Sequence, residues 1–259
     1  MYSIKEYRIP ATLEEADRLL HEKKSNTLIA GGMWLHMTAK KIDTAVDLSK
    51  LGLDLIAEND TEVRIGAMVT LRDLELNPVT SALWGGVLAE AVKPIVGTQF
   101  RNSATVGASV FSRFGFSDVI TALLALGAKV TLYRGGEMGL NEFLNSPMKK
   151  DILTHITVPK GALAGYASLR RSSTDFPVLA VCAAKKDGVY SVSVGARPHK
   201  AMRCEKAEAC LNAGDVNGAY AAIKEMPYGS NLRGSAEYRR EMSAVLLERV
   251  LIDMGEVPV

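Results

Sequence analysis

Apolar and polar residues alternate along the first part of the chain in a way that predicts short strands and helices. Thr12 followed by Glu15 is a capping-box pattern, which predicts a helix through about Lys24. The run NTLIA predicts a strand that ends at Gly31–Gly32, with a helix after the glycines. AVDLS predicts another short strand, and LDLIAEND with TEVRIGAMV predicts a hairpin around Asn59–Asp60.

The middle of the chain continues this mixture. TLRDLELNP predicts a helix stopped by Pro78, and SDVITALLALGA predicts a helix capped by Ser117 or Asp118 and ended by Gly127. KVTLYRGGEMGL predicts two short strands around a glycine turn. DILTHITVP predicts a strand closed by Pro159, which is the candidate boundary between two parts of the chain.

The last hundred residues contain the strongest hairpin signal. VLAVCAAKKDGVYSVSVGARP holds two β-rich runs joined by Asp187–Gly188, a favoured hairpin turn. SAEYRREMSAVLLERVLIDMG predicts a helix ended by Gly255. Its apolar positions at helical spacing are Tyr238, Met242, Val245, Leu246 and Val250. Hairpins mixed with helices favour an α+β fold over a regular parallel βαβ series.

Charge and hydropathy exclude two classes of protein. The 259 residues include 31 Lys and Arg against 29 Asp and Glu, so the net charge of +2 lacks the basic excess of a nucleic-acid binder. No stretch approaches the roughly 18 apolar residues of a membrane span, and the N-terminus does not read as a signal peptide. We therefore expect a cytoplasmic protein.

Cysteines and histidines give no sign of a metal centre. They are Cys182, Cys204, Cys210, His21, His36, His155 and His199. Their spacing fits neither a disulfide framework nor an iron–sulfur or zinc site. Any metal chemistry would have to come from another chain.

Three segments could together bind a long ligand with a pyrophosphate in its middle. Glycine-rich backbone offers N–H groups to anions, which suits Gly31–Gly32 and the segment SATVGAS with Thr105, Gly107 and Ser109. Asp118 could accept a hydrogen bond from a ribose or ribityl hydroxyl. Each signal is weak alone, because a glycine pair is commonly a structural turn and Asp118 could simply cap a helix. The chain has neither the G-x-G-x-x-G nor the P-loop pattern.

Five segments resemble the FAD-binding medium subunits of the molybdenum hydroxylases, the family of carbon monoxide dehydrogenase and xanthine dehydrogenase. AGGMWLHMTAK resembles the family's AGGTDL…MK, and QFRNSATVGASV resembles QIRNxATxGGNI. SDVITALLALGAKV is similar to SDLxPALLALGA, LRRSSTDFPVLAV to LKRxxGDFAxV, and GSAEYRREMSAVLLERVL to ASAEYRRHLAxVLxRRAL. Their order and spacing hold over essentially the whole chain, which is thereby identified as a member.

The resemblance implies a fold and a role. The fold would be an FAD-binding unit of two α/β subdomains, of the PCMH or vanillyl-alcohol-oxidase type, over residues 1–159 with a division near residue 55. A small α+β C-terminal flavoprotein domain of the carbon monoxide dehydrogenase type would cover residues 160–259. The chain would pass electrons from [2Fe–2S] clusters on a small subunit to NAD, a quinone, oxygen or another acceptor. A molybdopterin-binding large subunit would act on the substrate.

The resemblance also assigns residues to FAD, and it assigns no catalytic acid or base and no metal ligand. A first loop would follow the diphosphate, mostly through backbone N–H groups; it contains Ala30, Gly31, Gly32, Met33 and Trp34. A second loop contains Thr105, Val106, Gly107, Ala108 and Ser109. Asp118 would contact a cofactor hydroxyl, and Ile152 or Leu153 would lie near the flavin ring.

Two departures from the family pattern leave other functions open. Met33–Trp34 replaces a small polar pair, and Ala108–Ser109 stands where the family has Gly-Asn. Backbone donation survives the first change, although Met33 and Trp34 could instead pack under the loop. A methyl at Ala108 needs space and disfavours a positive φ. The alternative is a flavin-free assembly module of the same complex, and a stand-alone flavoprotein reductase ranks last.

Overall fold

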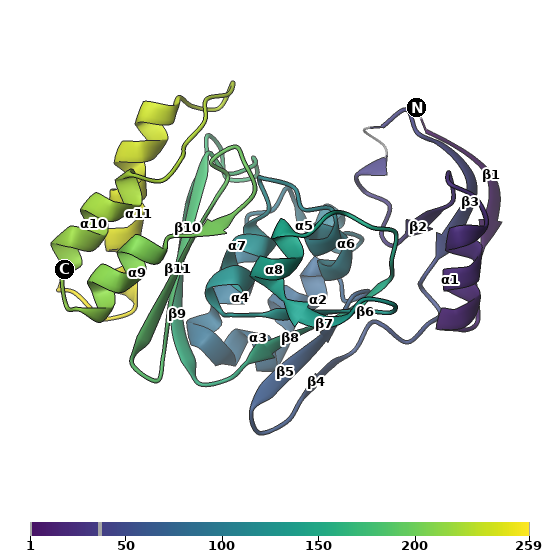
Figure 1. The fold of residues 1–259 in the computed structure, drawn as a ribbon, viewed down its shortest axis with the longest axis horizontal. Coiled ribbons are helices and arrows are strands. Elements are labelled where there is room, and N and C mark those ends of the chain that lie inside the picture. The colour runs from purple at the N-terminus through teal and green to yellow at the C-terminus, as the bar shows by residue number, and fades with distance from the viewer. Residues whose placement is uncertain (1, 36–37, 259) are drawn as a thin grey trace.

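The computed structural model describes residues 2–35 and 38–258. Three sheets follow one another along the molecule, with the N-terminal sheet at one end and the C-terminal helices at the other (Figure 1). This mixed α/β architecture confirms the expected fold class.

The N-terminal part is a small sheet backed by one helix. Its strands pair in parallel in the order β1-β3-β2, and α1 packs on β3. The elements are β1 (Ser3–Arg8), α1 (Leu13–Glu22), β2 (Thr27–Ile29) and β3 (Lys41–Asp47). Thr12 caps α1 as predicted, because Glu15 N donates to Thr12 Oγ1 at 3.2 Å; the Glu15 carboxylate reaches one residue further back than in a standard capping box and accepts from Ala11 N at 2.9 Å.

The central part is a five-stranded antiparallel sheet, in the order β4-β5-β8-β6-β7, covered by helices. Its strands are β4 (Ile56–Glu58), β5 (Glu62–Gly66), β6 (Lys129–Leu132), β7 (Gly136–Gly139) and β8 (Leu153–Pro159). Its helices are α2 (Leu71–Leu76), α3 (Pro78–Ala82), η2 (Leu83–Gly86), α4 (Val87–Val92), α5 (Thr98–Arg101), α6 (Val106–Phe111), α7 (Asp118–Ala125) and α8 (Leu140–Asn145). Both predicted hairpins are confirmed, and Ser117 rather than Asp118 caps α7, since Ser117 Oγ accepts from Ile120 N.

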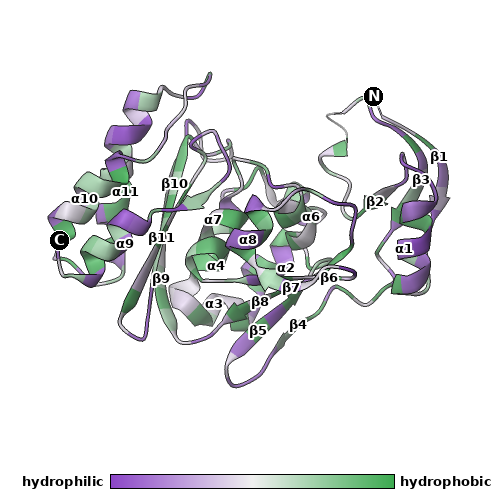
Figure 2. Cartoon of the chain, viewed as in Figure 1, coloured by the Kyte–Doolittle hydropathy of each residue, from purple (hydrophilic) through white to green (hydrophobic). Residues whose placement is uncertain are grey.

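The C-terminal part is a four-stranded antiparallel sheet, in the order β12-β11-β10-β9, with three helices on one face (Figure 1). These elements are β9 (Ala162–Leu169), β10 (Leu179–Lys186), β11 (Val189–Gly195), β12 (Met202–Arg203), α9 (Glu205–Asn212), α10 (Val216–Lys224) and α11 (Ala236–Asp253). Asp187 and Gly188 have φ of 51° and 81°, which confirms the tight hairpin turn. Helix α7 packs against β10 and β11, all its residues are buried, and its apolar side chains share one hydrophobic core with β5, β6 and β8 of the central sheet (Figure 2).

The predicted apolar stripe of α11 is partly wrong. Tyr238 is 46% exposed, whereas the neighbouring Arg239 is 1% exposed. The Arg239 guanidinium donates to the carbonyl oxygens of Val178 at 2.8 Å, Gly229 at 2.7 Å and Gly234 at 2.5 Å, and also to the side chain of Asn231. Because these acceptors satisfy the guanidinium, the helix buries a face that begins with an arginine.

A bidentate ion pair ties α1 to the β6–β7 turn. Arg134 donates from Nε to Asp17 Oδ1 at 2.7 Å and from Nη2 to Oδ2 at 2.6 Å. The guanidinium holds the pKa of Asp17 below its usual range. A carboxylate whose pKa is lowered in the folded state stabilises the fold above the unfolded-state pKa, and this stabilisation is lost as pH falls through the folded-state value.

We therefore expect Arg134→Gln to flatten the pH dependence of stability. The urea midpoint of the wild type should fall between about pH 5 and about pH 2 more steeply than that of the variant. Arg18→Gln is the matched control, because the Arg18–Glu22 pair on the same helix is largely exposed. Equal slopes for the wild type and Arg134→Gln would show that the pair contributes nothing.

Candidate functional site

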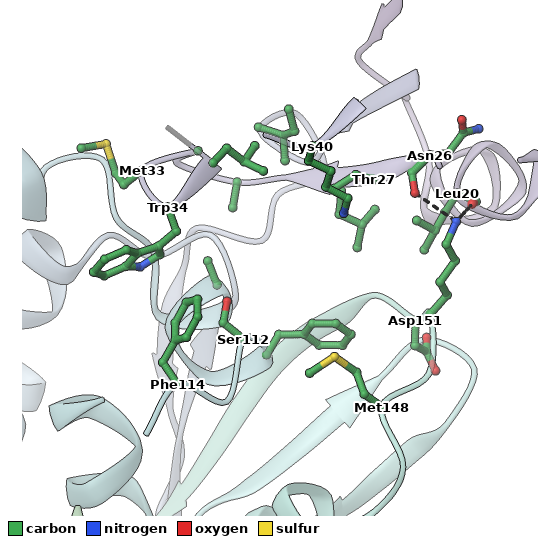
Figure 3. Close-up of a pocket in the computed structure, with 18 of the residues that line it drawn as sticks. Leu20, Asn26, Thr27, Met33, Trp34, Lys40, Ser112, Phe114, Met148 and Asp151 are labelled. Atoms are coloured by element: carbon green, nitrogen blue, oxygen red, sulfur yellow. Dashed lines mark hydrogen bonds between the residues drawn. The ribbon is translucent and has the colours of Figure 1, made fainter. Parts of the chain in front are cut away.

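A cavity of about 520 Å³ lies where the N-terminal sheet meets the central part (Figure 3). Its wall is built from residues 26–30 and 32–35, from Lys40, from α6 with the residues just after it, and from residues 148–151. In Figure 3, Lys40 reaches into the space, and Ser112, Phe114 and Met148 lie across from it. The volume and the mostly apolar wall are those of a small-molecule or cofactor site.

The two adjacent glycines, Gly31 and Gly32, have different structural roles. A Cβ on Gly31 would lie 1.5 Å from the Ser103 carbonyl oxygen, so Gly31 is needed for close packing against the segment before α6. Gly32 has φ of +67°, a left-handed conformation that glycine adopts freely, and a Cβ there would meet only Ile29 at 3.9 Å. Gly32 lines the cavity and Gly31 fixes the loop in place.

The loop after β2 presents five backbone donors. None of the N–H groups of residues 30–34 donates to any residue that the structure describes. Ala30, Gly32, Met33 and Trp34 all line the cavity. Consecutive unpaired N–H groups form an anion-binding concavity, so the loop fits a phosphate or pyrophosphate group.

Of the helix predicted after Gly32, the described residues show only a turn and the 3₁₀ residue Leu35. Residues 33–34 form a turn, Leu35 N donates to Gly32 O at 3.1 Å, and residues 38–40 have no regular structure. His36 lies outside the described residues. Anion binding here would therefore rest on the N–H groups themselves and on nearby cations, not on a helix N-terminus.

Three lysines surround the cavity. Lys150 Nζ donates to the carbonyl oxygens of Leu20 at 3.0 Å, Lys23 at 2.9 Å and Asn26 at 3.0 Å, which fastens the 148–151 segment to the end of α1. Burial and the nearby charge of Lys40 lower the pKa of Lys150. Lys40 and Lys149 also line the cavity, and the set of lysines favours a negatively charged ligand there.

The expected second loop is the N-cap and first turn of α6. Val106 N and Gly107 N donate to Val69 O and Ala67 O, each at 2.9 Å. Ala108 N and Ser109 N donate to Thr105 at 3.2 and 3.1 Å. The N–H groups of residues 106–109 are therefore all used within the protein, and this segment shapes the site instead of donating to it.

Glycine at 107 and alanine at 108 fit this helical turn. A Cβ on Gly107 would lie 2.5 Å from the Ala67 Cβ, so glycine allows α6 to pack on the central sheet. Ala108 lies inside the helix, where its methyl needs no positive φ. Together with Ala30 and Leu153, both residues line a smaller cavity of about 140 Å³ beside the main one. The second segment thus contributes apolar wall.

Asp118 is buried and already paired. Its Oδ1 accepts from Arg170 Nη2 at 2.5 Å and from the Tyr166 hydroxyl, and the residue is 3% exposed. Burial raises the pKa of Asp118, which the Arg170 charge opposes, and burial with the adjacent carboxylate raises that of Tyr166 well above its usual value. If a cofactor hydroxyl binds here, it would donate its hydrogen bond to the other carboxylate oxygen, Asp118 Oδ2.

The two residues proposed to lie near the flavin ring are placed differently. Ile152 is fully buried in the cluster between α1 and β3 and does not line a described cavity. Leu153 lines the smaller cavity. Of this pair, the structure brings Leu153 alone to the site.

An aromatic cluster, missed at the sequence level, surrounds Trp34. Its indole lies 5.4 Å from Phe100, 5.5 Å from Phe114, 5.4 Å from Phe116 and 5.6 Å from Phe176, between ring centroids. Four of the chain's six phenylalanines therefore meet at one tryptophan. The short spacing of Phe114 and Phe116 is the one sequence feature that indicates this cluster, whereas Phe176 comes from a distant segment.

Comparison with known proteins identifies the family. Residues 2–161 match the family described as the FAD binding domain in molybdopterin dehydrogenase, so the chain belongs to this family. It is 28% identical to the nicotine 6-hydroxylase medium subunit of Paenarthrobacter nicotinovorans over 96% of each chain. It is 26% identical to the putative xanthine dehydrogenase FAD-binding subunit XdhB of Escherichia coli K12, over 97% of this chain and 96% of that protein.

A solved structure shares the whole fold. The carbon monoxide dehydrogenase from Hydrogenophaga pseudoflava that lacks the Mo-pyranopterin moiety of the molybdenum cofactor contains a chain that superposes with a TM-score of 0.88. The two are 25% identical, and the match covers 98% of each chain. These comparisons confirm the resemblance, its fold, the oxidoreductase class and FAD as the family's cofactor.

Among the described residues, no group of three or more His, Cys, Asp or Glu side chains is placed to hold a metal ion. Likewise, no helix formed by residues 2–35 and 38–258 has the length and hydrophobicity needed to cross a membrane.

Proposed function

We propose that this chain is the FAD-binding, electron-transferring medium subunit of a molybdenum hydroxylase complex. It passes electrons from [2Fe–2S] clusters on a small subunit to an external acceptor such as NAD, and a molybdopterin-binding large subunit acts on the substrate. Family membership supports the cofactor, and the printed names of relatives, such as a carbon monoxide dehydrogenase medium chain, support the complex. We place the complex in the cytoplasm.

The observation that carries this proposal is a loop whose five N–H groups donate to no described residue, and four of whose residues line a large cavity. Residues 30–34 hold the pyrophosphate through their backbone, and Lys40 and Lys149 add positive charge. Ala108 and Leu153 supply apolar wall, while Thr105, Val106 and Ser109 support it. Bound FAD supplies the redox chemistry, and the protein supplies binding and orientation.

We also propose that the chain consists of two domains. Residues 1–159 form the FAD-binding domain, whose two subdomains divide near residue 55, and residues 160–259 form the C-terminal flavoprotein domain. The sheets support this division, because the three-stranded sheet ends at Asp47, the five-stranded sheet at Pro159, and the four-stranded sheet begins at Ala162.

A flavin-free assembly module is the second candidate. The Trp34 cluster favours it, because aromatic side chains fill the space beside Ser109 and Asp118. The two functions differ in one property: electron transfer out of the complex requires flavin only under the first.

Reoxidation of the iron–sulfur clusters tests the proposed function. The complex, co-purified with its partner subunits, is reduced anaerobically with dithionite and mixed with NAD⁺, a quinone or oxygen. We expect cluster reoxidation by at least one acceptor to stop when FAD is stripped and to return when FAD is added back. Reoxidation at an unchanged rate in the stripped complex would favour the assembly module.

A further inference from the structure

We propose that the Trp34 side chain controls cofactor occupancy by filling the Asp118 end of the cleft, from which FAD must displace it. This inference rests on the proposed function. In the proposed function, Trp34 contacts the diphosphate only through its backbone. The new role belongs to its indole, which competes with part of the cofactor for the same space.

The packing around Trp34 closes this end of the cleft. Phe100 lies on α5, Phe114 and Phe116 precede α7, and Phe176 precedes β10. The remaining space, lined by Trp34, Ser109 and Asp118 among others, is only about 30 Å³. That is too little room for a sugar or a ring, so a cofactor group that reaches Ser109 and Asp118 must move an aromatic side chain.

Trp34 is the ring best placed to move. It lies within the single turn closed by the hydrogen bond from Leu35 N to Gly32 O. Its indole N–H donates to no described residue, so the side chain is held by packing alone. Phe100, in contrast, is carried by helix α5.

Trp34 lines the main cavity as well as the small space, and so does Phe114, whereas Phe100, Phe116 and Phe176 line only the small space. Together with Phe114, Trp34 therefore lies between two spaces, one of about 520 Å³ with the anion-binding loop and one of about 30 Å³ with Asp118. Displacing the indole would join them into one cleft that runs from the anion-binding loop at residues 30–34 to Asp118.

The chain offers a built-in control, because Trp84 is its other tryptophan. Trp84 is 2% exposed, and its Nε1 donates to the Pro159 carbonyl oxygen at 2.8 Å. In protein labelled with 5-fluorotryptophan, Trp34→Phe and Trp84→Phe assign the two ¹⁹F resonances.

The test adds FAD to the labelled full-length protein and measures flavin retention after desalting in the same samples. We expect FAD to shift the Trp34 resonance toward its solvent-exposed position and to leave Trp84 unchanged. Trp34→Ala should bind FAD at least about tenfold more tightly, because no aromatic packing has to be broken first.

Two results would overturn the inference, and they differ in whether the proposed function also fails. Retained flavin with an unmoved Trp34 resonance and unchanged affinity in Trp34→Ala would remove the role of Trp34 while the proposed function stands. No flavin retention by either the wild type or Trp34→Ala would overturn both.

Discussion

Gly31→Ala should destabilise the protein by more than about 3 kcal/mol and abolish FAD retention, whereas Gly32→Ala should cost only about 1–2 kcal/mol. A Cβ at position 31 would lie 1.5 Å from the Ser103 carbonyl oxygen, a separation that only a backbone shift can relieve. A Cβ at position 32 meets nothing closer than 3.9 Å, so its cost is the left-handed φ of +67°.

Urea denaturation of the two glycine variants measures this difference, with FAD retention read on the same samples. Each variant adds one methyl group to the same loop, so each is the control for the other. Equal destabilisation by the two substitutions would contradict the assignment of Gly31 to close packing.

Asp118→Ala should lower the free energy of unfolding by about 3–5 kcal/mol, because it leaves a buried cation without its partner. The Arg170 side chain is 8% exposed, and it donates to Asp118 Oδ1 at 2.5 Å. The Tyr166 hydroxyl donates to the same oxygen and would also lose its acceptor.

A double variant separates the structural role of Asp118 from its proposed contact with FAD. Asp118→Ala combined with Arg170→Met should recover part of the lost stability, because no unpaired charge remains. FAD affinity should stay low in the double variant if Oδ2 accepts from a cofactor hydroxyl. Recovery of wild-type affinity together with stability would leave Asp118 as a packing residue alone.

Local signals in the sequence predicted local structure well. The helix cap at Thr12, the turn at Asp187–Gly188 and the hairpin around Asn59 each depend on residues within a few positions, and each is confirmed. Short helices were harder: α6 begins inside the expected second loop, since Thr105 caps a helix whose first turn contains glycine and alanine.

The candidate site depended on contacts between distant segments, which no local pattern encodes. Gly31 packs against Ser103, and Asp118 pairs with Arg170. Phe176 reaches Trp34 from the far side of the boundary at Pro159. The resemblance to the family located the loops. The residues that pair with the side chains and N–H groups of these loops could be identified only from the fold.

FAD binding by residues 30–34 and the adjoining cavity is central to the proposed function. The most direct test is the absorption spectrum of the freshly purified protein, recorded again after incubation with excess FAD and desalting. We expect retained flavin bands near about 370 and about 450 nm. Absence of these bands, even in protein co-purified with its partner subunits, would contradict FAD binding at this site.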